Sequence, residues 1–176
     1  MRSRKVSDEV LYAADAMVSV CSADMDALAG AAAGTPRRRI RICAHPDAGD
    51  PLHEMLIVLG KGNYIRPHRH AAKSESFHVI KGSADIVLFD ESGKPEERIR
   101  LGDYRSGRSF YFRMNRSQFH SVVVSSEFFV FHETTNGPFD RSDTEFAPWS
   151  PEEGDIAAGN RFLEEALAQL EVSHDA

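Results

Sequence analysis

Cysteine is scarce in this chain, which has only Cys21 and Cys43 among its 176 residues. The two are far apart and form no C-x-x-C pair, so neither a disulfide framework nor a cysteine-rich zinc module is expected. Each is predicted to be a small, buried or half-buried side chain. A reducing compartment suits such a chain, and we expect it to be cytoplasmic.

The chain also lacks an excess of basic charge and a long apolar run. Its 21 Lys and Arg residues are outnumbered by 27 Asp and Glu residues, which gives a formal net charge of −6. Proteins that bind nucleic acid usually carry a basic face, so no nucleic-acid partner is expected. No apolar stretch approaches the ~20 residues of a membrane helix, and no membrane insertion is expected. Asp8, Glu9 and Asp15 interrupt the segment that would follow the basic N-terminus of a signal peptide.

One basic run is present, at Arg37, Arg38, Arg39 and Arg41. Residues 39–43 alternate charged and apolar side chains, which predicts a strand. Because no second basic cluster lies near it in sequence, we interpret the run as the solvated face of a strand at a sheet edge.

Short apolar segments separated by turn residues make up the middle of the chain. Many short strands at this spacing predict an all-β sandwich or closed barrel. A helix is expected at each end, one over residues 24–33 after an N-cap at Ser22 and one that opens at Ser150 and Pro151 and runs to about Val172. The strands are predicted at residues 39–43, 54–59, 76–80, 84–89, 97–101, 109–114, 117–124 and 127–132.

The pattern indicates a single domain in three parts. Residues 1–38 form an N-terminal extension with a short helix, residues 39–134 form the barrel core, and residues 135–176 form a loop and the C-terminal helix.

The strongest chemical signal lies in residues 62–82. His68 and His70 are two residues apart, so their side chains share one face of an extended strand. Glu75 follows a short turn at residues 71–74 and can return on the neighbouring strand. Two imidazoles and a carboxylate that face one point suit a divalent transition metal.

His120 is a fourth candidate ligand. It begins an apolar strand whose alternation places His120, Val122 and Val124 on one face. Three nitrogens and one carboxylate leave a position open on a five- or six-coordinate ion, as a reactive site requires. The expected cofactor is one divalent ion of Fe, Mn, Ni, Co or Zn, and this ligand set does not select among them.

The spacing of these ligands resembles the first motif of the cupin superfamily, G-x5-H-x-H-x3-4-E-x6-G. Residues 62–82 fit every fixed position of that motif. The second cupin motif, G-x5-P-x-G-x2-H-x3-N, is met only in part. His120 takes its histidine, whereas its Pro, Gly and Asn are replaced by Asn115, Ser117 and Val124. The resemblance implies a cupin double-stranded β-helix, a jelly-roll barrel, between the two helical ends.

A narrower resemblance covers most of the chain and is to the WbuC family of cupin-fold metalloproteins. It rests on residues 50–51, 62–70, 75, 87–90, 120, 137–139 and 145–149. Members of that family are often associated with the biosynthesis of bacterial surface polysaccharide (O-antigen). The resemblance therefore implies a sugar or a sugar-nucleotide intermediate as the small molecule.

Tyr64 and Arg66 alternate with His68 and His70, so all four are expected on one strand face. Tyr64 either packs in the core or points at a ligand on the metal, as a candidate catalytic residue. Arg66 either holds a carboxylate or phosphate of a ligand or forms a structural ion pair.

Gln118 and Glu133 are the remaining candidates. Gln118 alternates with His120 and either reaches a ligand or lies in a loop. Glu133 follows the last predicted strand and is a candidate general base or acid. His45 and His53 have no partners near them in sequence and are interpreted as structural.

Three functions are consistent with these residues. The first is a metal-dependent enzyme that acts on a small molecule, and the second is a binding or sensory module without turnover. The third is an Fe(II)-dependent dioxygenase, which would consume oxygen. The cupin resemblance further implies a homodimer.

Overall fold

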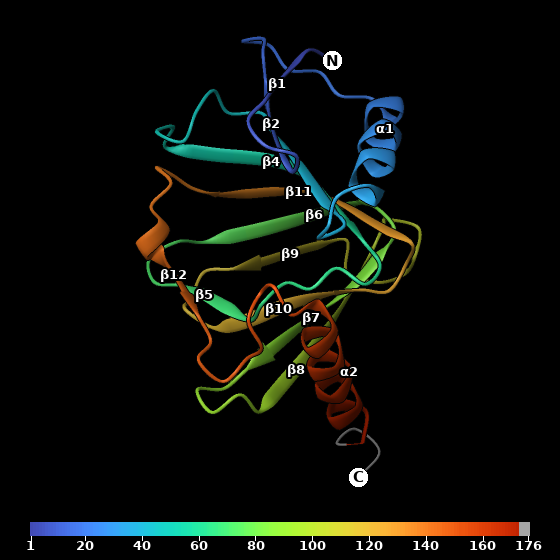
Figure 1. The fold of residues 1–176 in the computed structure, drawn as a ribbon, viewed down its shortest axis with the longest axis vertical. Coiled ribbons are helices and arrows are strands. Elements are labelled where there is room, and N and C mark those ends of the chain that lie inside the picture. Colours follow the sequence, from blue (N-terminus) through green and yellow to red (C-terminus); the bar gives the residue numbers. More distant parts are fainter. Residues whose placement is uncertain (173–176) are drawn as a thin grey trace.

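In the computed structural model, which describes residues 1–172, two β-sheets face each other and one helix packs on the outer side of each (Figure 1). Residues 173–176, at the end of the predicted C-terminal region, lie outside the described residues. The expected all-β jelly roll with a helical segment at each end is thereby confirmed.

The first sheet has seven strands and the second has five. In spatial order, the first sheet consists of β1 (Ser3–Lys5), β2 (Val10–Ala13), β3 (Arg39–Cys43), β4 (Leu52–Gly60), β11 (Phe128–Asn136), β6 (Glu75–Lys81) and β9 (Tyr111–Met114). The second consists of β12 (Thr144–Phe146), β5 (His68–His70), β10 (Phe119–Val124), β7 (Ser83–Phe89) and β8 (Pro95–Gly102).

The main core lies between the two sheets, because alternate side chains of each strand face inward. Phe77 and Phe131 come from the first sheet, and Ile86 and Val122 come from the second; all are at most 4% exposed. Each large apolar side chain removed from water in this way contributes about 1.5–3 kcal/mol. This packing fixes how the inner faces of the sheets meet, and therefore where the candidate ligands lie.

Strand β3 lies inside the first sheet, which corrects the prediction of a solvated edge strand. It pairs with β2 in parallel on one side and with β4 in antiparallel on the other, and β1 forms the outer edge. The N-terminal segment, which the sequence predicts as an extension with a short helix, supplies the two strands that cover β3. Helix α1 (Ser22–Ala33) packs on the outer face of β3, where Ile40 and Ile42 are buried. The N-cap of α1 is Cys21, one residue before the predicted Ser22.

Two strands near the site also differ from prediction. Strand β11 continues to Asn136, so Glu133 lies within the strand and not after it. Strand β12, Thr144–Phe146, falls in a segment that its polar residues predicted to be a loop. Its register places Thr144 opposite His70 and Phe146 opposite His68, so β12 supports the histidine strand.

Helix α2 (Ile156–Val172) begins later than the predicted start at Ser150. Ser150 and Pro151 are held by the segment before β5: Arg66 donates to Ser150 Oγ at 3.2 Å, and Tyr64 donates to the Pro151 carbonyl at 2.8 Å. These long-range bonds compete with helix initiation, and Asp155 caps the helix by accepting the Ala158 N–H at 3.0 Å.

In the described part of the chain, no helix combines the length and apolar character needed to cross a membrane.

The face of α2 that packs on the second sheet includes a glycine at a close contact. A Cβ on Gly159 would meet the Tyr64 ring at 2.4 Å, whereas a Cβ on Gly30 of α1 would meet nothing within 4 Å. We expect Gly159→Ala to destabilise the protein by about 1–2 kcal/mol, because overpacking outweighs the gain in helix propensity. Gly30→Ala gains the same propensity without a clash and is expected to stabilise by up to about 1 kcal/mol. Urea unfolding of both variants measures the difference, and equal shifts would contradict the expected packing.

Candidate metal centre and its cavity

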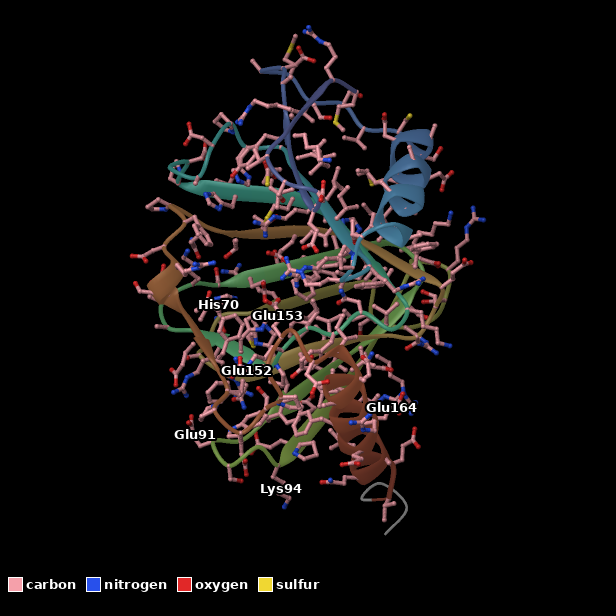
Figure 2. The ribbon with its side chains drawn as sticks, in the orientation of Figure 1. His70, Glu91, Lys94, Glu152, Glu153 and Glu164 are labelled. Carbon is pink, nitrogen blue, oxygen red and sulfur yellow. The ribbon has the colours of Figure 1, made fainter. Side chains whose placement is uncertain are left out.

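Three histidines meet at one end of the space between the sheets. His68 and His70 extend from β5, and His120 on β10 lies directly opposite His68 in the antiparallel register. Their candidate donor atoms all lie within 4.8 Å of one another. Figure 2 shows His70 on the histidine strand, near the level where the two sheets meet. The structure therefore brings together the three histidines that the sequence singles out.

Glu75 reaches the cluster from the opposite sheet, at the start of β6. Its Oε2 is 3.2 Å from His120 Nε2, and its Oε1 is 3.9 Å from His70 Nε2. The turn at residues 71–74 carries the chain from one sheet to the other, which is why a residue so close in sequence can face the histidines.

The imidazoles are oriented by oxygen atoms behind them. His68 Nδ1 is 2.9 Å from the Arg66 carbonyl, and His120 Nδ1 is 3.0 Å from the Gln118 carbonyl. His70 Nδ1 lies 3.3 Å from the hydroxyl of Thr144. When Nδ1–H donates to such an oxygen, the Nε2 lone pair is left free, as is usual for histidines that ligate metals.

The electrostatics of the cluster favour neutral imidazoles at two positions. Burial, followed by the proximity of His120, lowers the pKa of His68 to about 3. Burial also lowers the pKa of His70. Burial alone would lower the pKa of His120 as well, but the Glu75 carboxylate raises it by more, and the net pKa lies above the usual value. In the protein without a metal, Glu75 thus favours the protonated form of His120.

The donor set fits a divalent metal ion. Glu75 is 6% exposed, and among the described residues its buried Oε2 has a hydrogen-bond partner only when His120 Nε2, 3.2 Å away, carries a proton. Burial opposes its charge, but the three histidines hold the pKa of Glu75 below its usual value. A divalent ion would take the place of the proton shared by His120 and Glu75, and it would complete an arrangement of one carboxylate and three Nε2 atoms.

The cluster opens into a cavity of about 560 Å³ between the sheets. This volume lies in the range of small-molecule sites in proteins. The wall includes the histidine cluster at one end and residues of β2, β3 and β4 at the other. The N-terminal strands therefore help to form the cavity.

Glu133 lines this cavity from the centre of β11, next to the metal centre. Its register partners are Met55 and Phe77, so two apolar side chains flank it. Burial, and secondarily the charge of Glu75, raises the pKa of Glu133 well above 4.5. A carboxyl whose pKa is raised in this way is better suited to donate or accept a proton beside the metal centre than an exposed glutamate is.

Tyr64 lies on the other side of the second sheet from the cavity, which corrects the expectation that it shares a face with His68. It is 1% exposed, packs with Phe89 and Leu163 between the sheet and α2, and donates its hydroxyl to Pro151. Residue 64 precedes β5, where strand alternation does not apply.

Arg66 lines the cavity, but its donors are occupied. They bond to the hydroxyl of Ser150, the carbonyl of Ala147 and the carboxylate of Glu152. The structure therefore favours the structural ion pair of the two alternatives. Gln118 does not line the cavity; its amide donates to the Phe89 carbonyl and to Glu96.

Sequence reasoning missed His45, His53 and Arg41 as residues of the cavity wall. The two imidazoles stack with ring centroids 4.1 Å apart and an interplanar angle of 3°, so they are partners in space despite their separation in sequence. The alternation in β3 contained the signal for Arg41: if Ile40 and Ile42 face the helix, then Arg41 faces the interior.

Comparison with known families gives one match, to a family described as a domain of unknown function, DUF6016, over residues 20–101. This match spans less than half of the chain. No curated protein matches the chain.

Several solved structures resemble the fold. A protein of Shewanella oneidensis is 17% identical, with 70% of this chain and 77% of that chain covered and a TM-score of 0.49. Oxalate decarboxylase from Bacillus subtilis is 21% identical, with 56% of this chain and 24% of that chain covered and a TM-score of 0.45. A Streptococcus pyogenes protein of unknown function is 14% identical, with 60% and 80% covered and a TM-score of 0.45.

The chain thus spans only about a quarter of the oxalate decarboxylase that it resembles, and at these identities and scores the likenesses carry no argument about activity. The sheet topology and the histidine cluster are observations on this chain itself. On these grounds the chain has the double-stranded β-helix fold of cupins, with a three-histidine cluster that can hold a metal ion.

Proposed function

We propose that this chain is a metal-dependent enzyme that acts on a small polar molecule bound in the cavity. The observation that supports the proposal most directly is the arrangement of His68, His70, His120 and Glu75, oriented from behind and open to a cavity of about 560 Å³. A divalent ion held there would polarise a substrate oxygen or lower the pKa of a bound water.

In this proposal Glu133 moves the proton. Its carboxyl lies on the same cavity wall as Glu75 and holds its proton more tightly than an exposed glutamate does. Arg66 and Tyr64 do not contact the substrate in this proposal. They hold the segment before β5 in place through bonds to Ser150 and Pro151, and so they set the direction of the histidine strand.

The proposed substrate class is a sugar or a sugar nucleotide in the synthesis of bacterial surface polysaccharide. This part rests on the WbuC-like residues at 62–70, 75, 137–139 and 145–149. We further propose that the protein works in the cytoplasm as a homodimer, for which light scattering is the direct measurement of subunit number.

Elemental analysis of protein purified without added metal is the first test. We expect about one divalent transition metal per chain, with Fe, Mn, Ni, Co and Zn measured together. Absence of stoichiometric metal, both as purified and after incubation with each ion, would contradict the proposal.

A screen of sugars and sugar nucleotides against the loaded protein then separates the three functions. Product formation that is lost in Glu133→Gln supports the enzyme. Stoichiometric binding without product supports a binding module instead. Oxygen consumption with Fe(II) but not with Zn(II) supports a dioxygenase.

A further inference from the structure

The guanidinium group of Arg41 lies in the cavity wall and forms no ion pair with the described residues. Ile40 and Ile42 face α1, so Arg41 lies on the inner face of β3. Its cross-strand neighbours are Val10 on β2 and Ile57 on β4, both apolar. The side chain is half-buried, and its Nε is buried without a hydrogen-bond partner in the part of the chain that the structure describes.

The other cations of the cavity wall are all neutralised by carboxylates. Arg37 and Arg39 share Glu9 and Glu153, as four ion pairs. Arg66 pairs with Glu152, and Lys73 pairs with Asp143 at 3.1 Å. Within residues 1–172, Arg41 has no carboxylate at ion-pair distance.

The nearest polar groups do not supply the missing negative charge. The thiol of Cys43 lies close to the Arg41 side chain, but burial raises its pKa, so it is uncharged at neutral pH. Glu133 is within electrostatic reach of Arg41 but forms no ion pair with it. A half-buried guanidinium without a counter-charge costs free energy, which a bound anion would recover.

We propose that Arg41 is the anchor for a carboxylate of the bound substrate, whose opposite end faces the histidine cluster. This inference rests on the proposed function only for its second part, that the other end of the substrate contacts the metal centre. The same cavity is lined by both groups, so one molecule can contact both.

The charge balance favours a carboxylate over a phosphoryl group. One unpaired guanidinium offers a single positive charge and a fork that matches one carboxylate. A phosphate monoester carries a charge of about −1.5 to −2 at neutral pH and would need a second free cation, which the described cavity wall lacks.

The positions of the strands set the length of the ligand. β3 and β6 are separated by β4 and β11, which places their backbones about 14 Å apart at the usual spacing of strands. The Arg41 side chain spans only part of that distance. The carboxylate of the substrate must therefore lie several bonds from the substrate atoms that face His68 and Glu75. A sugar acid meets this requirement, whereas a two-carbon diacid is too short.

Glucuronate, glucose and glucose 1-phosphate provide a matched set of probes. Titration calorimetry with metal-free and with Zn(II)-loaded protein is expected to show glucuronate binding at least about tenfold more tightly than either other sugar. Arg41→Gln should weaken glucuronate binding by about 10- to 100-fold and leave glucose binding unchanged.

Arg39→Gln is the matched control, because Arg39 lies two residues away on the same face of β3 and is already paired. Its effect on glucuronate binding should stay below about threefold. Thermal unfolding provides a second measurement: Arg41→Gln should leave the Tm unchanged or raise it, because an unpaired charge is removed.

The inference is overturned if Arg41→Gln binds glucuronate as tightly as the wild type, or if glucose 1-phosphate binds more tightly than glucuronate. Absence of glucuronate binding to the wild type, or a clear fall in the Tm of Arg41→Gln, would overturn it as well. An Arg41-dependent interaction that is identical with and without Zn(II) would support the anchor while contradicting the role of the metal.

Discussion

Replacement of His68 and His70 together by alanine is expected to abolish metal uptake. These two side chains supply two of the three imidazole donors, and the remaining His120 lies 3.2 Å from Glu75, which favours the protonated imidazole. Two donors that neutralise one another have little reason to release a proton for a metal. Elemental analysis should fall from about one ion per chain to background.

Thermal unfolding gives an independent measurement of the same effect. A ligand present at a thousand times its Kd stabilises a protein by about 4 kcal/mol. For a chain of this size, that corresponds to a fall in Tm of roughly 8–16 °C when a chelator removes the ion. The double variant should show no response to chelator.

His78→Ala is the matched control for the loss of a histidine. His78 is on β6, three residues after Glu75, but it is exposed and its ring packs against Phe110 outside the cavity. This variant should bind metal as the wild type does. Stoichiometric metal in the double variant, or its loss in His78→Ala, would rule out the assigned ligands.

The grouping of most of the candidate ligands could be predicted because their geometry is mainly local. Strand alternation alone places His68 and His70 on one face, and a four-residue turn returns Glu75 toward them. His120 is different, since it reaches the cluster through the pairing of β10 with β5 across more than fifty residues. Strand alternation gives its face, whereas only the resemblance to the second cupin motif indicates which strand it joins.

The failed predictions concern residues whose environment is set by distant segments. Tyr64 was assigned a face by extending the alternation of β5 upstream, but the strand begins at His68 and α2 buries the tyrosine on the opposite side. The local capping signals at Ser150 and Pro151 were sound, yet these residues bond to Arg66 and Tyr64 instead. In both cases tertiary contacts outweighed a weak local preference.

The environment of Arg41, and with it the proposed role of this residue, also could not be predicted from neighbouring residues in the sequence. Its sequence neighbourhood is a basic run, which most often means a solvated surface. Its actual environment depends on β2 and β4, which flank it, and on α1, which occupies the other face. An unpaired charge could be recognised only after its neighbours had been paired.

Glu133→Gln is expected to have the largest effect on turnover. A side chain that transfers a proton in the transition state contributes about 10²- to 10⁴-fold, so the variant should lose activity by that factor while it keeps its metal. Gln has nearly the same shape as Glu but cannot supply or accept the proton. Glu127→Gln, an exposed position just before β11, is the control and should leave turnover unchanged.

The same variant makes a prediction about stability in the metal-free protein. Because burial and Glu75 raise the pKa of Glu133 well above 4.5, the folded state keeps a proton that the unfolded state releases. Below pH 4.5 both states are protonated, and as the pH rises from there to the native pKa of Glu133 this carboxyl makes an increasingly unfavourable contribution. Glu133→Gln removes that contribution, so its Tm relative to the wild type should increase over this pH window, by about 2–4 °C for each kcal/mol relieved. A difference in Tm that stays constant with pH would mean that Glu133 is ionised in the folded protein, and its role as a proton donor would then have to be abandoned.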